Sequence, residues 1–180
     1  MTHREAPMFT HLDFLAGRTT TSDLADLVDD AVRSCDTQLV NFGGHHRFTG
    51  TIQTLSCRDD NSLLKDVLST PGDGRVLVVD GGGTTHSALI GDVIAGIGAR
   101  HGWAGVVIHG AVRDSRLLAR VPIGVKGIGT NPRRSGKRGE GEVGAPLSFG
   151  GVTFTPGETV YSDEDGVVVI DVPPVGRAVH

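Results

Sequence analysis

The 180-residue sequence contains only two cysteines, Cys35 and Cys57, and no CxxC pair. A disulfide-stapled scaffold or a zinc site needs more cysteines at closer spacing, so neither is expected. The two thiols are instead predicted to be free and partly buried. The histidines form no HxH or HxxxH pair, so the usual spacings of a histidine metal site are missing as well.

Long apolar runs are also lacking. The longest uninterrupted apolar stretches have about five residues, whereas a helix needs roughly 20 to span a bilayer. The first residues, MTHREAPMFTHLDF, lack the apolar segment of a secretory signal, so we expect a cytoplasmic protein with no membrane partner. The 17 Lys and Arg against 21 Asp and Glu give a formal net charge of −4. Because nucleic-acid-binding surfaces are usually basic, no nucleic-acid partner is expected.

The residue present in excess is glycine, with 27 of 180 residues, about twice the usual frequency of roughly 7%. Clusters such as Gly81–Gly83 and Gly150–Gly151 predict tight turns and close approaches of the backbone. The length and the 38% apolar content fit one globular domain with its own core. We predict a loosely attached N-terminal arm over residues 1–21, a single α/β domain over 22–172 and a C-terminal tail over 173–180.

Apolar periodicity predicts the regular elements. Helices are expected from Ser22 to about Val32 and over the segment that Asp60-Asn61-Ser62 begins. Apolar runs predict strands at 51–57, 75–80, 105–109, 123–128 and, after a polar loop at 130–146, at 151–154, 159–161 and 166–172. A helix from about Ser87 or Asp92 to Arg100 would connect two of these strands as a parallel βαβ unit. The predicted sheet is therefore mixed, with parallel strands in the middle and antiparallel strands at the C-terminal end.

The triple glycine after the strand at 75–80 invites comparison with a dinucleotide-binding turn. The fingerprint GxGxxG requires a third glycine where this sequence has His86, and no acidic ribose ligand ends the next strand. A Rossmann-type cofactor site is therefore not expected, and the glycines are interpreted as turn formers. The basic stretch 133–138 is interpreted as a solvated loop, because Glu140 and Glu142 offset its charge.

Two charged segments are predicted to meet beside the βαβ unit. Gly91 to Ile94 begin the helix, where free backbone N–H groups and the positive end of the helix dipole favour a carboxylate. Arg113-Asp114 follows the next parallel strand, at the same carboxyl edge of the sheet. Asp92 and Asp114 offer hard oxygen ligands for Mg²⁺ or Mn²⁺, and Arg113 can bind a substrate carboxylate through two parallel hydrogen bonds. The spacing equally allows a structural Arg–Asp pair and an ordinary acidic residue in a first helical turn.

Five segments carry a family resemblance: NFGG at 41–44, VLVVDGGG at 76–83, GWAGVVIHGAVRD at 102–114, FGGVTF at 149–154, and 163–168. Over about residues 22–172 the chain resembles the family named for the regulator of ribonuclease E activity A (RraA-like). That family includes class II 4-hydroxy-4-methyl-2-oxoglutarate aldolases. Its enzymes carry an Asp, twenty intervening residues and then Arg-Asp, whereas the ribonuclease-regulating branch typically lacks that Asp and the second residue of the pair. Asp92 and Arg113-Asp114 complete the enzyme pattern.

The resemblance implies a swivelling β/β/α fold, assembled as a homotrimer or a hexamer with sites near the subunit interfaces. It implies that Arg113 binds the carboxylate and keto region of a small 2-oxo acid and that Asp114 ligates a divalent metal cation, Mg²⁺ or Mn²⁺. Asp92 would hold a metal-bound water, the candidate for proton transfer. The backbone amides that would bind substrate belong to Gly91, Asp92, Val93 and Ile94.

The implied reaction is cleavage of 4-hydroxy-4-methyl-2-oxoglutarate to two pyruvates. Breaking the C3–C4 bond leaves an electron pair as pyruvate enolate, whose oxygen the metal and Arg113 would stabilise. Decarboxylation of oxaloacetate forms the same enolate, so one site can catalyse both reactions. The competing hypothesis is a non-enzymatic regulator that binds and inhibits a ribonuclease E-type enzyme. A methyltransferase is not expected, because the sequence lacks a glycine-rich adenosylmethionine loop.

Overall fold

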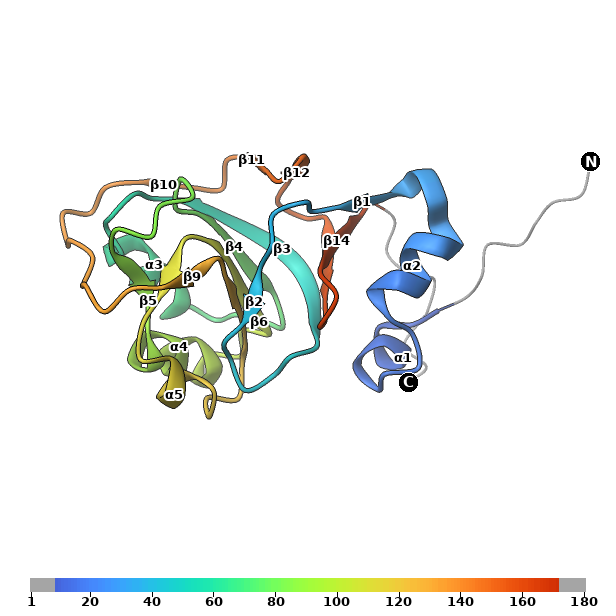
Figure 1. Ribbon diagram of the computed structural model, residues 1–180, viewed down its shortest axis with the longest axis horizontal. Helices are drawn as coiled ribbons and strands as arrows, with labels where there is room; N and C mark the ends of the chain where they lie inside the picture. Colours follow the sequence, from blue (N-terminus) through green and yellow to red (C-terminus); the bar gives the residue numbers. More distant parts are fainter. Residues whose placement is uncertain (1–8, 172–180) are drawn as a thin grey trace, which may run out of the picture.

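The computed structural model describes residues 9–171, so the first part of the expected arm and the tail at 173–180 lie outside the described residues. Its main feature is a curled mixed sheet (Figure 1). Its strands follow one another in the order β1 (Val32–Ser34), β14 (Val167–Ile170), β13 (Thr159–Ser162), β3 (Phe48–Ser56), β4 (Val76–Asp80), β6 (Gly105–His109), β8 (Gly124–Gly127) and β2 (Val40–Asn41). One more strand, β10 (Glu142–Val143), pairs with β3 outside this order.

The direction of the strands divides this sheet into two parts. Strands β3, β4, β6 and β8 are parallel. Strands β13, β14 and β1 continue the sheet antiparallel on one side, and β2 closes the other side antiparallel to β8. The helix α4 (Asp92–Arg100) connects β4 to β6. The predicted βαβ unit and the mixed sheet are both confirmed.

Successive apolar side chains of β4 point to opposite faces of the sheet, and each face has its own hydrophobic core. Leu77 and Val79 face a core shared with α3 (Ser62–Leu68), α4 and α5 (Ser115–Leu118). Val76 and Val78 face the opposite core, which the hairpin of β11 (Leu147–Phe149) and β12 (Val152–Phe154) completes with β13. The layers are thus strands, strands and helices, as a β/β/α fold requires. No helix within residues 9–171 is both long and apolar enough to cross a membrane.

The ring of Phe48 explains two of the glycines. Gly105 on β6 and Gly124 on β8 are register partners, and the ring lies across both of them. A Cβ at these positions would lie 2.3 and 2.0 Å from ring atoms of Phe48. Only glycine lets the Phe48 ring lie so close to the backbone of both strands. The prediction that glycines allow close approaches to the backbone is confirmed at these two positions.

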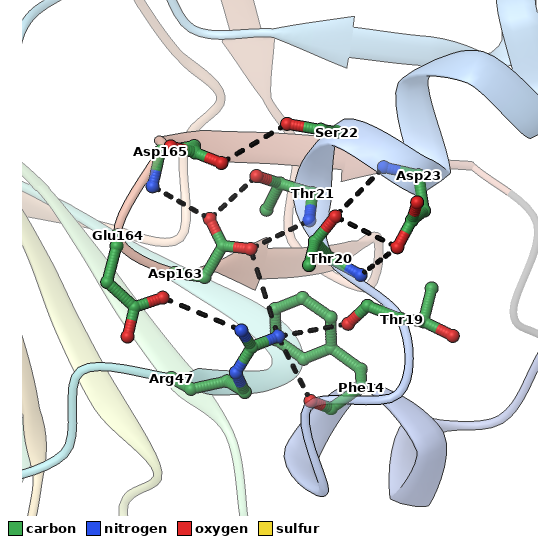
Figure 2. A network of polar contacts seen from close by, with 10 residues as sticks. All are labelled: Phe14, Thr19, Thr20, Thr21, Ser22, Asp23, Arg47, Asp163, Glu164 and Asp165. Carbon is green, nitrogen blue, oxygen red and sulfur yellow. Dashed lines mark hydrogen bonds and ion pairs between the residues drawn. The ribbon is translucent and has the colours of Figure 1, made fainter.

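The described part of the predicted arm, residues 9–21, packs against the rest of the domain and is not loosely attached. Helix α1 (His11–Leu15) buries Phe14 completely, edge-on against Tyr161 with ring centroids 5.0 Å apart. Arg47 donates hydrogen bonds to the carbonyls of Phe14 and Thr19, at 3.3 and 2.9 Å (Figure 2). A single aromatic side chain and a polar network hold this segment against the sheet. It therefore does not need the repeated apolar residues by which a longer helix is recognised in a sequence.

Helix α2 (Thr21–Val28) is shorter than predicted and begins one residue earlier. Its cap is Thr20 rather than Ser22: the Thr20 hydroxyl accepts from the backbone N–H of Asp23, whose carboxylate accepts from the backbone N–H of Thr20. A 3₁₀ turn at Asp29–Ala31 ends the helical segment, and Val32 starts β1 by pairing with β14. Pairing with the sheet therefore overrides local helix propensity at Val32.

Cys35 and Cys57 are free and buried, as predicted. Burial raises the pKa of the Cys57 thiol to about 12, so the thiol stays protonated at neutral pH.

Candidate functional site

A second, smaller sheet positions the predicted site. It consists of the parallel strands β5 (Ala88–Ile90), β7 (Ala111–Val112) and β9 (Gly129–Thr130), and it lies beside α4 (Figure 1). The sequence did not predict it, and the alternative helix start at Ser87 is wrong because β5 precedes α4. Arg113 therefore follows β7 and not, as expected, the strand of the main sheet that ends at His109.

Pairing of β5 with β7 brings the two predicted segments together. Ile90 and Val112 are register partners, so the next residues, Gly91 and Arg113, leave neighbouring strands side by side. The backbone N–H of Arg113 donates to the carbonyl of Ile90 at 2.9 Å. The Arg113-Asp114 pair is thus held beside β5 by a backbone hydrogen bond, and the first turn of α4 follows β5 directly along the chain.

At Gly91 the backbone that leads into α4 comes close to the side chains of Arg113 and Asp114. This glycine precedes α4 in extended conformation, and a Cβ there would lie 3.0 Å from Asp114 Oδ2 and 3.1 Å from Arg113 Cγ. The absence of a side chain lets both charged groups pass over the N-terminal turn of the helix. Asp92, half-buried, is the first residue of that turn. Two carboxylates and one guanidinium therefore lie at the positive end of a helix dipole.

Arg113 and Asp114 contact each other without satisfying each other. Arg113 Nε donates to Asp114 Oδ2 at 3.0 Å, and their side chains are 27% and 39% exposed. Within residues 9–171, the terminal nitrogens of Arg113 and Oδ1 of Asp114 have no hydrogen-bond partner. Asp114 has φ 52° and ψ 38°, a left-handed conformation that Asp tolerates better than most residues. Both groups retain the capacity to bind a ligand.

All the predicted site residues line one cleft of about 290 Å³. Arg113 and Asp114 also line a second cleft of about 430 Å³ on α5. The first cleft contains side chains that the sequence analysis did not assign to the site. Its additional polar lining residues are Asn61, Lys65, Arg134, Ser135 and Lys137.

The basic stretch 133–138 thus lines the cleft instead of forming a purely solvated loop. Isolated bridges join Arg134 to Ala88 and Gly136 to Asp60, and the Ser135 hydroxyl donates to the carbonyl of Ala88 at 2.7 Å. Sequence spacing carries no signal for this contact, because about 70 residues separate the loop from Asp60. Only the clustering of four basic residues within the stretch was visible.

His109, next to the βαβ turns, has a structural environment. Its ring stacks on Phe149 with centroids 4.6 Å apart, and Nδ1 lies 3.1 Å from Asp80 Oδ1. Neither His86 nor His109 lines the cleft.

The donor set fits a divalent cation that is mostly hydrated. Among residues 9–171, no group of three or more His, Cys, Asp or Glu side chains is arranged as a metal cage. Mg²⁺ does not need one, since it commonly keeps several waters and binds one or two carboxylates. The exposed Asp114, with Oδ1 free of hydrogen bonds, offers one hard oxygen ligand of this kind.

Comparisons with known proteins agree on the family. A family model described as Aldolase/RraA, RraA-like, matches residues 21–169. The RNA-processing inhibitor RraA from Thermus thermophilus is 42% identical, with a TM-score of 0.84, over 89% of this chain and 97% of that chain. A structure from Geobacillus kaustophilus, described as an S-adenosylmethionine:2-dimethylmenaquinone methyltransferase, is 42% identical, with a TM-score of 0.85, over 89% of this chain and 100% of that chain.

A third relative is more distant. RraAS2 of Streptomyces coelicolor, an unusual member of the RNase ES inhibitor RraA family, is 27% identical, with a TM-score of 0.67, over 91% of this chain and 81% of that chain. The names of these relatives cover a regulator and an enzyme on the same fold.

Proposed function

The chain belongs to the RraA-like family, and from this premise we propose that it is a divalent-metal-dependent lyase that forms pyruvate from a 2-oxo acid. The proposed reaction is cleavage of 4-hydroxy-4-methyl-2-oxoglutarate to two pyruvates, with decarboxylation of oxaloacetate through the same pyruvate enolate. The observation that carries the proposal is the unsatisfied pair Arg113–Asp114, lying against the first turn of α4. Because both side chains are partly exposed, their free polar atoms can exchange water for a ligand in the cleft.

Arg113 holds and stabilises the substrate in this mechanism. Its terminal nitrogens have no partner within residues 9–171, so one edge of the guanidinium is available to the carboxylate and keto oxygen of the substrate. Gly91 to Ile94 line the same cleft at the positive end of α4, where the first backbone N–H groups of a helix have no partner within the helix. Both stabilise negative charge, and that charge increases on the keto oxygen as the enolate forms.

Asp92, the other carboxylate of the cleft, is proposed to organise the water that transfers protons to and from the substrate. In cleavage, the C4 hydroxyl loses its proton and the C3–C4 bond breaks. The electron pair of the C3–C4 bond forms the enolate, and C3 of the enolate then takes up a proton to give pyruvate. A divalent cation held by Asp114 supplies Lewis-acid charge at the keto oxygen when it is bound.

The decisive measurement is pyruvate release from each of the two substrates by the purified protein, with Mg²⁺ or Mn²⁺ and with excess EDTA. We expect release from both with metal, loss of release in EDTA, and recovery when Mg²⁺ is restored. Full oxaloacetate decarboxylation in excess EDTA would contradict the metal requirement. No release from either substrate under any condition would contradict the lyase.

The second candidate function is a regulator that binds a ribonuclease E-type enzyme. It is supported by two relatives that are described as inhibitors of RNA processing or of RNase ES. Pull-down with ribonuclease E and inhibition of its cleavage in vitro, together with no turnover of either 2-oxo acid, would favour this function. Turnover without binding would favour the lyase.

We also propose a homotrimer or a hexamer of the same chain, with the cleft near a subunit interface. Two large apolar side chains border the cleft residues and are exposed: Val93 by 69% and Leu117 by 51%. Covering them with a second subunit would remove apolar surface from water. Leu117→Glu should then shift the mass measured by light scattering toward the monomer, whereas Leu12→Glu, at a site on α1 that is 71% exposed, serves as the control.

A further inference from the structure

The single tyrosine of the chain, Tyr161 on β13, is buried among rings of the N-terminal segment. Phe9 and Phe14 meet its ring edge-on, with centroids 5.8 and 5.0 Å away. His11 stacks on it, with centroids 5.5 Å apart and an interplanar angle of 14°. None of these residues lines the cleft of the proposed lyase. Of the three N-terminal rings, only the imidazole of His11 can gain a charge near neutral pH.

The contacts of His11 favour its neutral form. Its ring nitrogen Nδ1 lies 3.4 Å from the hydroxyl oxygen of Thr49, and this hydroxyl donates its own proton to the carbonyl of Val160 at 2.7 Å. The Thr49 oxygen can therefore only accept from His11, which places the proton of a neutral imidazole on Nδ1. Burial lowers the pKa of His11, because the half-buried ring loses water that would solvate its charged form.

No carboxylate compensates for a positive charge on His11. Within residues 9–171 the ring forms no salt bridge, and β14, beside Tyr161, carries only Val and Ile. The nearby cation Arg47 opposes such a charge, since its guanidinium lies over the Phe14 ring, 5.0 Å from the centroid. The carboxylates on the surrounding elements are bound to other groups or exposed to water: Asp13 on α1, Asp23 and Asp26 on α2, and Asp163 and Glu164 after β13.

Helix α1 depends on its contacts with the sheet. With five residues it is much shorter than a helix that is stable by itself in water, so packing has to hold it. His11 and Phe14 are three residues apart and therefore lie on the same face of the helix. Their contacts with Tyr161, together with the hydrogen bond from Arg47 to the Phe14 carbonyl, attach this face to the sheet (Figure 2).

Helix α2 is attached to the sheet independently of α1. Thr21, its first residue, donates from its backbone N–H and its hydroxyl to the buried carboxylate of Asp163, at 2.7 and 2.6 Å (Figure 2). Gly17 lies between the two helices with φ 72°, and no atom lies within 4 Å of the position that a Cβ would take. Because glycine adopts both signs of φ without strain, the backbone can change direction at this point while α2 stays in place.

We propose that protonation of His11 releases α1 from the sheet and uncovers Tyr161, so that docking of the N-terminal segment responds to pH. The proton places a charge among the rings of Phe14 and Tyr161, where no carboxylate is available, whereas water solvates the same charge once α1 has left the sheet. The docked state is therefore fully stabilised above the ordinary histidine pKa of about 6.5, and this stabilisation is lost as the pH falls below that value.

The single tyrosine serves as the reporter in the first test. Full-length protein that carries 3-fluorotyrosine is followed by fluorine NMR between pH 7.5 and pH 5. In the wild-type protein we expect a second resonance, at the position of a solvent-exposed tyrosine, to grow severalfold as the pH falls. His11→Phe keeps an aromatic ring on Tyr161 but cannot be protonated, so its spectrum should not change with pH. His86→Phe, at an exposed histidine elsewhere, is the matched control and should keep the wild-type pH dependence.

Amide hydrogen exchange measures the helix itself. At each pH, the exchange rates of α1 in the intact protein are divided by those of a synthetic peptide of residues 9–19, which removes the intrinsic effect of pH on exchange. Protection of α1 should fall severalfold between pH 7.5 and pH 5 in the wild-type protein and stay constant in His11→Phe. Protection of β3 should stay constant in both proteins, because only α1 leaves the sheet.

Three results would overturn the proposal. Constant protection of α1 in the wild-type protein would show that His11 does not control docking. A pH dependence that persists in His11→Phe would assign the effect to another group. Protection that increases in acid would show that a cation–π contact of the charged imidazole with Tyr161 outweighs its burial. If His11→Phe does not fold, His11→Gln replaces it, since glutamine cannot be protonated and keeps a donor for Thr49.

Discussion

The pair Arg113–Asp114 in the cleft and the pair Arg47–Asp163 beside the N-terminal helices contain the same two residue types. They differ in the exposure of the side chains and in the number of hydrogen bonds that these make. Asp163 is 2% exposed, and its carboxylate accepts from the backbone N–H and hydroxyl of Thr21, at 2.7 and 2.6 Å, and from the backbone N–H of Asp165 (Figure 2). Asp114 is 39% exposed and accepts from Arg113 alone within residues 9–171.

The guanidinium groups differ in the same way. Arg47 Nη1 donates to two backbone carbonyls and lies 3.9 Å from Asp163, so its nitrogens serve to attach α1 and α2 to the sheet. Among residues 9–171, the Arg113 side chain donates only from Nε. The two pairs therefore differ in how much of their hydrogen-bonding capacity the described residues use, and the capacity left at Arg113–Asp114 is open to a ligand. Removing either aspartate should therefore have different consequences.

The largest effect is expected for Asp114→Ala. Loss of the proposed metal ligand should abolish metal-dependent pyruvate release, while the free energy of unfolding changes little because the side chain is exposed. Asp73→Ala is the matched control, since Asp73 is also exposed and has the same left-handed backbone, with φ 51°. Release by Asp114→Ala at the wild-type rate would show that this aspartate is not required.

Arg113→Ala should lower the rate by a factor on the order of 10² or more, the usual result of removing one preorganised charge from a developing oxyanion. Arg113→Lys should recover only part of this loss, because lysine cannot form two parallel hydrogen bonds. Steady-state kinetics with oxaloacetate measure both variants, with the exposed Arg120→Ala as the control. Equal rates for the lysine variant and wild type would show that the planar group is not needed.

Asp163→Ala should affect stability instead of catalysis. It leaves the backbone N–H and the hydroxyl of the buried Thr21 without their acceptor and removes a nearby counter-charge of Arg47, which costs about 3 kcal/mol of the free energy of unfolding. Urea denaturation measures this loss, and kcat below the unfolding transition should stay near the wild-type value. Asp165→Ala, at an exposed neighbour, should cost much less. A lost activity with unchanged stability would reverse the distinction between the two pairs.

The smallest effect concerns Asp60, a satisfied carboxylate like Asp163 that anchors the basic loop. Burial alone would raise its pKa, but hydrogen bonds from Ser62 and from the backbone N–H of Arg138 outweigh it and lower the pKa to about 2. Because this value lies below the unfolded pKa of about 3.9, the stabilisation is present above pH 4 and is lost as the pH falls toward 2.

Asp60→Asn should therefore lose less stability than wild type between pH 5 and pH 2.5, as thermal unfolding at a series of pH values will show. Asp66→Asn, an exposed change on α3, should follow the wild-type profile. Parallel profiles for wild type and Asp60→Asn would show that this carboxylate does not contribute to the acid sensitivity.

Much of the fold was predictable because its signals are local. The apolar runs that became β4 and β6, and the helix between them, are strands and a helix on periodicity alone. The small sheet was not predictable, since β5, β7 and β9 have only two or three residues each and exist by pairing with one another. Helix α1 was missed for the same reason, because burial of Phe14 stabilises it more than any pattern in its sequence.

For the cleft, the residues proposed to carry the chemistry could be named from the sequence and its family resemblance. The Asp92 and Arg113-Asp114 pattern and the start of a helix at the first of them can be read along the chain. The sequence carries no sign that Asp163 is saturated with hydrogen bonds while Asp114 accepts from Arg113 alone within residues 9–171, or that Lys65, Arg134 and Lys137 share a cleft with Arg113. Hydrogen-bond saturation and charge clustering depend on contacts between residues far apart in the sequence, whereas the start of α4 and the apolar strands β4 and β6 depend on residues that are neighbours along the chain.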